Sequence, residues 1–117
     1  MKISEVKKEL TEKGLLDQRQ LFCYSTLTGV INGQSFQNLV GIVFGESQMT
    51  LYGGNMDGSL KEALVTISYD SIQRFDFHQR FLYAYVSFSA GTDTFRFYNY
   101  DKKVMKQGFK DAGLLQS

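Results

Sequence analysis

Few residues of this chain could do chemistry. The sequence has one histidine, His78, and one cysteine, Cys23. A protein zinc site draws three or four ligands from His, Cys and carboxylates, and these two residues are expected on different strands, far apart. A Ser-His-Asp or Cys-His nucleophile would have to use His78, and no nucleophile-elbow glycine pattern accompanies it. We therefore interpret Cys23 as a core residue and His78 as a surface residue near a hairpin end.

A glycine-rich segment at residues 53–59 has the glycine spacing of a phosphate-binding loop. The position that needs lysine holds Ser59, and no helix is expected after it. Its glycine position and ligand count do not fit a calcium loop. The segment is interpreted as a hairpin loop. The sequence predicts a non-enzymatic protein with no catalytic residue, no metal site and no cofactor.

The composition of the chain limits which classes of partner and which cellular location are expected. The chain has 117 residues, of which 15% are aromatic, and 13 Lys and Arg against 12 Asp and Glu. Proteins that rely on phosphate contacts usually carry a strong basic bias, so no nucleic acid is expected. One cysteine cannot form an intramolecular disulfide. Residues 1–9 lack the apolar core of a secretory signal, and no run of 18 apolar residues predicts a transmembrane segment. We expect one cytoplasmic domain over residues 1–117.

Helical periodicity is confined to the two ends. Residues 1–14 predict a short amphipathic helix, with Ser4 as N-cap and Gly14 after its end. Residues 100–115 predict a second helix, which Asn99 or Asp101 caps and which ends at Gly113. We interpret its lysines as the solvated face of a packed helix rather than as a surface for anionic lipids.

Residues 18–98 have the pattern of antiparallel β structure. They are dense in β-branched and aromatic residues, and turn signals come every 8–12 residues. The clearest turn is Asn32-Gly33, which favours a two-residue type I′ hairpin. Seven strands are predicted, at about 19–31, 35–45, 48–53, 59–68, 71–78, 81–89 and 93–98.

Seven strands followed by one amphipathic helix resemble the pleckstrin-homology (PH) superfold. The segments 39–44, 49–52 and 65–72 are similar to paired strands of bacterial PH-like and GRAM-like domains. The resemblance implies a mainly β fold: a two-sheet antiparallel barrel that the C-terminal helix caps, here with an extra N-terminal helix. Eukaryotic PH domains often bind phosphoinositides through cations of the first hairpin. Residues 30–35 contain none, so no phosphoinositide site is recognised.

An aromatic face is the main candidate for binding. Alternation predicts an inward set on the last three strands, consisting of Phe75, Phe77, Leu82, Ala84, Val86, Phe88, Phe95 and Phe97. Phe81 and the remaining neighbours then point outward. The candidate interaction surface consists of Arg74, Asp76, His78, Tyr83, Tyr85, Arg96 and Tyr98. The sixth strand also allows the opposite assignment, with Phe81, Tyr83 and Tyr85 inward.

Tyr and Arg are enriched in protein interfaces because they bury large areas and keep a polar group. The leading hypothesis is therefore a PH-like module that binds a protein partner or itself, as a possible homo-oligomer. Other interpretations stay open: an ordinary surface, a face that the N-terminal helix covers, or a stacking platform for single-stranded nucleic acid. The alternative function is a β-barrel that carries a small apolar ligand or a lipid.

Overall fold

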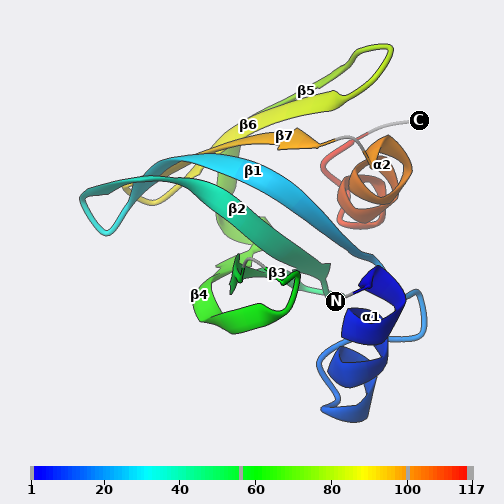
Figure 1. Ribbon diagram of the computed structural model, residues 1–117. Helices are drawn as coiled ribbons and strands as arrows, with labels where there is room; N and C mark the ends of the chain where they lie inside the picture. The colour runs from blue at the N-terminus through cyan, green and yellow to red at the C-terminus, as the bar shows by residue number, and fades with distance from the viewer. Residues whose placement is uncertain (1, 56, 100, 116–117) are drawn as a thin grey trace.

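The computed structural model describes residues 2–55, 57–99 and 101–115 (Figure 1). Met56, in the predicted loop, Tyr100, at the predicted start of the second helix, and the terminal residues Met1, Gln116 and Ser117 lie outside the described residues. The helices are α1 (Ile3–Glu12) and α2 (Lys102–Asp111), and a short 3₁₀ turn, η1, spans Tyr69–Ser71. The strands are β1 (Phe22–Ile31), β2 (Gln34–Phe44), β3 (Gln48–Gly54), β4 (Leu60–Ser68), β5 (Ile72–Gln79), β6 (Ala84–Ala90) and β7 (Asp93–Asn99).

The seven strands form one antiparallel sheet in the order β4-β3-β2-β1-β7-β6-β5. β1 is central because it pairs with β2 on one side and with β7 on the other. Within the described part of the chain the edge strands β4 and β5 do not pair, and η1 connects them, so the sheet is curved but not closed. The predicted mainly β fold, with seven antiparallel strands followed by a C-terminal helix, is confirmed. Its strands make one open sheet rather than two separate sheets of a barrel.

The core lies between the inner face of the sheet and α2. Phe44, Leu51, Val86 and Phe97 of the strands are fully buried, and Phe109 of α2 packs edge-to-face on Phe44 with ring centroids 5.1 Å apart. α2 approaches closely because Gly108 has no side chain: a Cβ there would lie 2.4 Å from the ring of Phe44. The C-terminal helix therefore covers the concave side of the sheet.

Local signals for turns and caps are mostly confirmed. Asn32 and Gly33 have φ angles of 53° and 78°, as a type I′ turn requires, and they join Ile31 to Gln34. The Asp101 side chain accepts a hydrogen bond from the backbone N–H of Val104 and caps α2. Ser4 is not an N-cap: α1 begins at Ile3, and Lys2 precedes it without a side-chain cap. Ser4 thus lies inside the first turn.

Two strand boundaries differ from the prediction. β1 begins at Phe22 rather than at residue 19, because the Asp17 carboxylate accepts the backbone N–H of Arg19 and Gln20 adopts a φ of 58°. β6 begins at Ala84, after a loop in which the N–H of Arg80 donates to the carbonyl of Tyr83 over 2.8 Å. Leu82, which alternation predicts to point inward, lies in this loop and is 64% exposed.

No helix in the described ranges is both long and apolar enough to cross a membrane.

Candidate interaction surface

Strand register assembles one row of side chains across the outer face of five strands. Because paired residues share a face of a sheet, Tyr85 of β6 lies between His78 of β5 and Tyr98 of β7. Tyr98 pairs in turn with Thr26 of β1, which pairs with Leu39 of β2. Residues on strands far apart in the sequence therefore form one continuous row. This row confirms that the inward set on β6 is Ala84, Val86 and Phe88, which are all buried.

Aromatic rings cluster at one end of this row. The ring centroids of Tyr85 and Tyr98 lie 4.9 Å apart at an interplanar angle of 66°, and those of Tyr83 and Tyr98 lie 5.9 Å apart. His78 follows at 6.2 Å from Tyr85. Tyr98 is 46% exposed. We call His78, Tyr83, Tyr85 and Tyr98 the tyrosine face.

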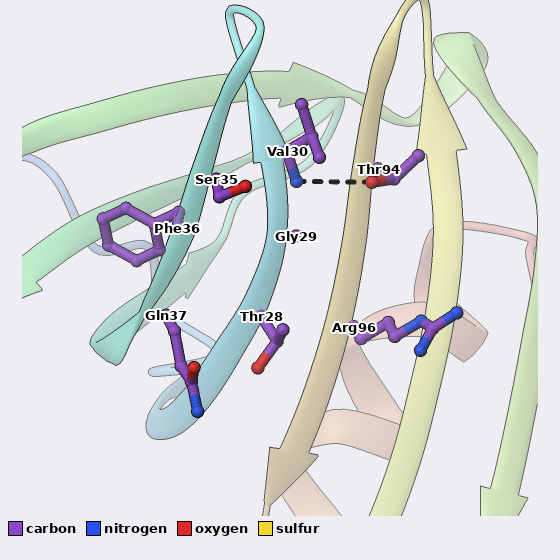
Figure 2. A pocket seen from close by; sticks show the side chains of 8 residues that line it. All are labelled: Thr28, Gly29, Val30, Ser35, Phe36, Gln37, Thr94 and Arg96. Atoms are coloured by element: carbon purple, nitrogen blue, oxygen red, sulfur yellow. Dashed lines mark hydrogen bonds between the residues drawn. The ribbon is translucent and has the colours of Figure 1, made fainter.

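The next row on the same face is polar. The register places Ser87 beside both Asp76 and Arg96, and Arg96 beside Thr28. An open hollow with a volume of about 440 Å³ lies beside Arg96, between residues of β1, β2 and β7 (Figure 2). Its lining is mixed: Arg96 and Thr94 of β7 lie beside Thr28 and Val30 of β1 and beside Ser35, Phe36 and Gln37 of β2. Arg96 thus lies between the tyrosine face and this hollow.

The hollow in Figure 2 depends on a close approach of β1 and β7 at Gly29. A Cβ at Gly29 would lie 2.0 Å from the carbonyl oxygen of Thr94, so only glycine allows the two backbones to pair here. Beside it, the backbone N–H of Val30 donates to Thr94 Oγ1 over 3.3 Å, as Figure 2 shows. This contact brings the outer faces of β1 and β7 into one surface.

Arg74 departs from the predicted alternation. The register between β5 and β6 shifts between Gln73 and Asp76, and Arg74 has a φ of 57°. These are the marks of a β-bulge, in which an extra residue of one strand has no partner on the other. Gln73, which pairs with Ser89, occupies the ladder position on the outer face that simple alternation gives to Arg74. The role of Arg74 in an interaction surface stays a prediction.

A second hollow, of about 640 Å³, extends the tyrosine face beyond Tyr98. Ile3, Tyr24, Leu39 and Tyr98 contribute its apolar lining. Sequence reasoning missed Ile3 and Leu39, which are 42% and 43% exposed. Leu39 could have been found, because the Asn32-Gly33 turn sets the register that pairs it with Thr26. Nothing local in the sequence brings Ile3 to this place.

α1 covers a different part of the outer face. Its Val6 and Leu10 pack on Phe22 of β1, Val43 of β2 and Tyr52 of β3, and all of these are buried. Arg19 ties the following segment down: its guanidinium donates to the carboxylates of Asp17 and Asp111 and to the carbonyl of Phe44. Of the interpretations left open by the sequence, cover of the last three strands by the N-terminal helix is not what its buried residues Val6 and Leu10 do. Its cover lies over β1, β2 and β3.

Cys23 and His78 lie where the sequence predicts them. Cys23 of β1 is fully buried in the core, where Asn99 Nδ2 donates to its Sγ over 3.0 Å, and burial raises the pKa of the thiol to about 12. His78 is exposed, and its Nε2 lies 2.9 Å from an Asp76 carboxylate oxygen. In the described part of the chain no three His, Cys, Asp or Glu side chains are grouped as a metal would need.

The glycine-rich segment begins in β3, with Gly53 and Gly54, and its remaining described residues lie in the loop between β3 and β4. The Asp57 carboxylate accepts hydrogen bonds from the backbone N–H and the hydroxyl of Ser59, and the N–H of Asn55 donates to the carbonyl of Ser59. The hydroxyl of Tyr24 donates to the carbonyl of Gly58 and joins the loop to β1. Its polar groups are thus used in closing a hairpin.

Comparison with known proteins finds similarity at the level of solved structures. No family model matches the chain, and no curated protein matches it. One similar solved structure comes from work on the critical structural role of the PH and C1 domains of the Vav1 exchange factor. It aligns with 12% sequence identity and a TM-score of 0.48. The alignment covers 95% of this chain and 32% of that one, so this chain spans about a third of that chain's length.

Proposed function

We propose that this chain is a non-enzymatic PH-like binding module that engages a protein through the tyrosine face. The observation that carries the proposal is a ring cluster, in which His78 and Tyr98 are exposed and Tyr83 and Tyr85 half-buried, on a sheet face whose neighbouring apolar part is covered by the chain's own α1. Tyrosines bind partners effectively because two χ angles order a large ring and the hydroxyl stays available for hydrogen bonds.

The surroundings of the tyrosine face favour a protein over single-stranded nucleic acid. Tyr85 and Tyr98 meet edge-on, at 66°, so together they do not offer parallel faces to stacked bases. The Asp76 carboxylate lies beside His78 and would repel a phosphate backbone. On the other side, Leu39 and Ile3 continue the face as apolar side chains. A mixed aromatic, aliphatic and arginine surface is typical of the centre of a protein interface.

Light scattering coupled to size exclusion, from low to high micromolar concentration, tests whether the partner is a second copy. If the chain associates, we expect the Tyr85→Ala, Arg96→Ala double variant to weaken association at least about tenfold, because it removes one anchor of each favoured type. The Thr66→Ala variant, on the outer face of β4, is the matched control. Association that the double variant leaves unchanged contradicts the proposal.

A photo-crosslinking residue at position 85 tests for a different protein partner in the cells that express the chain. We expect an adduct of discrete mass from position 85 and none from position 66. If position 85 gives neither self-crosslinks nor such an adduct, the tyrosine face is an ordinary surface.

We do not propose the alternative of an apolar ligand held inside the sheet. The inner aromatic side chains pack on one another: Phe88 contacts Phe75, Phe95 and Phe97 with ring centroids 5.2–6.4 Å apart. A small molecule that copurifies in native mass spectrometry would reopen that alternative.

A further inference from the structure

The tip of the β5–β6 hairpin carries the two most exposed large apolar side chains in the described part of the chain. Phe81 is 90% exposed and Leu82 is 64% exposed. The hairpin projects from the body of the molecule next to α2 (Figure 1). Two adjacent apolar residues at a projecting tip lie far outside the core, so packing within this chain does not explain them.

Contacts with α2 brace the tip. Lys102 Nζ donates to the carbonyl oxygen of Arg80 over 3.0 Å and to that of Phe81 over 2.6 Å. The loop is also closed by the hydrogen bond from the N–H of Arg80 to the carbonyl of Tyr83. The tip is therefore hydrogen-bonded both to α2 and across its own loop, with an ammonium group beside it. A pre-ordered loop loses less entropy when it binds.

The charge around the tip is positive. Arg80 belongs to the tip itself, and Lys106 lies one turn along α2 from Lys102, on the same flank of the helix. Lys103 is an exposed neighbour. The sequence has no carboxylate between residues 77 and 92. The Asp101 side chain is the cap of α2.

We propose that this tip docks on an anionic lipid bilayer, with Phe81 and Leu82 inserted at the interface and the cations of Arg80 and α2 against the headgroups. Charge complementarity selects an anionic surface, since basic residues next to a membrane gain from its negative potential. The shape selects a bilayer over a protein: two side chains offer far less area than a stable protein interface needs, whereas a fluid interface accepts a projecting apolar tip.

This surface differs from both sites considered above. The tip belongs to a different hairpin from the first one, whose residues 30–35 contain no lysine or arginine. Its apolar residues are not part of the tyrosine face. The lysines of α2 alone have the pattern of a solvated helix face. The contact of Lys102 with the carbonyl of Phe81 puts the start of this lysine-bearing helix next to the tip, and only the tertiary structure supplies that placement.

Vesicle flotation with the full chain tests the proposal. We expect the protein to float with phosphatidylcholine vesicles that contain phosphatidylserine, and much less with pure phosphatidylcholine. The Phe81→Ser, Leu82→Ser double variant should lower the partition coefficient about tenfold or more, because it removes the inserted apolar area. Leu64→Ser, which changes a leucine 41% exposed on β4, is the control and should bind as the parent does.

Charge variants test the electrostatic part. Lys103→Glu, Lys106→Glu should weaken binding to phosphatidylserine vesicles, and added salt should weaken binding by the parent protein. Lys61→Glu, on β4, is the matched control. If Lys61→Glu weakens vesicle binding as much as Lys103→Glu, Lys106→Glu does, the assignment of the cationic flank is overturned.

A tryptophan at the tip gives an independent measurement, because the natural chain has none. Phe81→Trp should show a blue shift of its emission when phosphatidylserine vesicles are added, and Leu64→Trp should not. Absence of the shift, absence of flotation by the parent protein, or full binding by the Phe81→Ser, Leu82→Ser variant each overturns the proposal. Oligomers that depend on Phe81 without lipid binding would assign the tip to a protein contact instead.

Discussion

Two regions rich in apolar side chains lie on the same outer face of the sheet, and they differ in burial. Around Phe22, Val43 and Tyr52, α1 packs Val6 and Leu10 onto the strands, and every one of these residues is at most 9% exposed. Around Tyr85 and Tyr98, the rings contact each other, and Tyr98 remains 46% exposed. The alternation of side chains along the strands does not distinguish the two regions, because both consist of outward-facing residues of paired strands.

The difference lies in side-chain type and in reach. The covered region is centred on Phe22 and Val43, whose side chains have no polar group, and it also contains Tyr52, whereas the exposed region consists mainly of tyrosines, whose hydroxyls remain available to water. α1 is held over the covered region by Arg19, which joins Asp17 to Asp111 of α2. The chain thus buries Phe22, Val43 and the ring of Tyr52 itself, whereas Tyr98 stays exposed to solvent.

The largest expected effect breaks the sheet that carries both regions. Gly29→Ala should lower the free energy of unfolding by about 3 kcal/mol, because the new Cβ would lie 2.0 Å from the Thr94 carbonyl oxygen and force β1 away from β7. Urea denaturation measures the change. Thr28→Ala, one residue away on the outer face, is the control. A loss below about 1 kcal/mol for Gly29→Ala would mean that the ladder relaxes easily there.

Removing the cover over β1–β3 should have the next largest effect. Leu10 is 5% exposed, and Leu10→Ala should cost about 2–3 kcal/mol of unfolding free energy by leaving a cavity between α1 and the sheet. Leu15, 46% exposed just after the helix, is the matched control, and Leu15→Ala should cost far less. Similar losses for the two variants would show that α1 does not pack as described.

Truncating the tyrosine face should change stability little. Tyr85→Ala and Tyr98→Ala should each cost about 1 kcal/mol or less, and a double-mutant cycle should give a coupling of about 0.5–1 kcal/mol for their edge-on contact. Thermal and urea unfolding of the single and double variants measure this. Losses as large as that of Leu10→Ala would place the tyrosines in the structural core and argue against a binding role.

Acid should loosen the cover slightly. The hydrogen bond from Arg19 holds the pKa of Asp17 below its ordinary value of 3.8 in the folded protein. Asp17 therefore adds stability above about pH 4, and this part is lost as the pH falls through the lower folded pKa. Both side chains are about one-third exposed, so the loss should stay under about 1 kcal/mol. Asp17→Asn should remove this pH dependence; an unchanged dependence would assign it to other carboxylates.

The core of the sheet could be predicted far better than its edges. Local chemistry was sufficient for the Asn32-Gly33 turn, the Asp101 cap and the inward set Val86, Phe88, Phe95 and Phe97, because turn conformation and two-residue alternation depend on neighbours in the chain. The face of Leu82 was predicted wrongly, and the ladder position of Arg74 did not follow alternation. A bulge and a loop interrupt the alternation there, and neither position has a Gly or Asn signal.

By itself, the sequence determined the element order, the buried Cys23, the first hairpin and the tyrosines as a candidate surface. Only the tertiary structure decided which part of the outer face α1 covers, which five strands share the row through Tyr98, and that Lys102 braces the Phe81 loop. The physical reason is sequence separation. Turns, caps and alternation follow from adjacent residues, whereas these three features need contacts between segments that only the whole folded chain brings together.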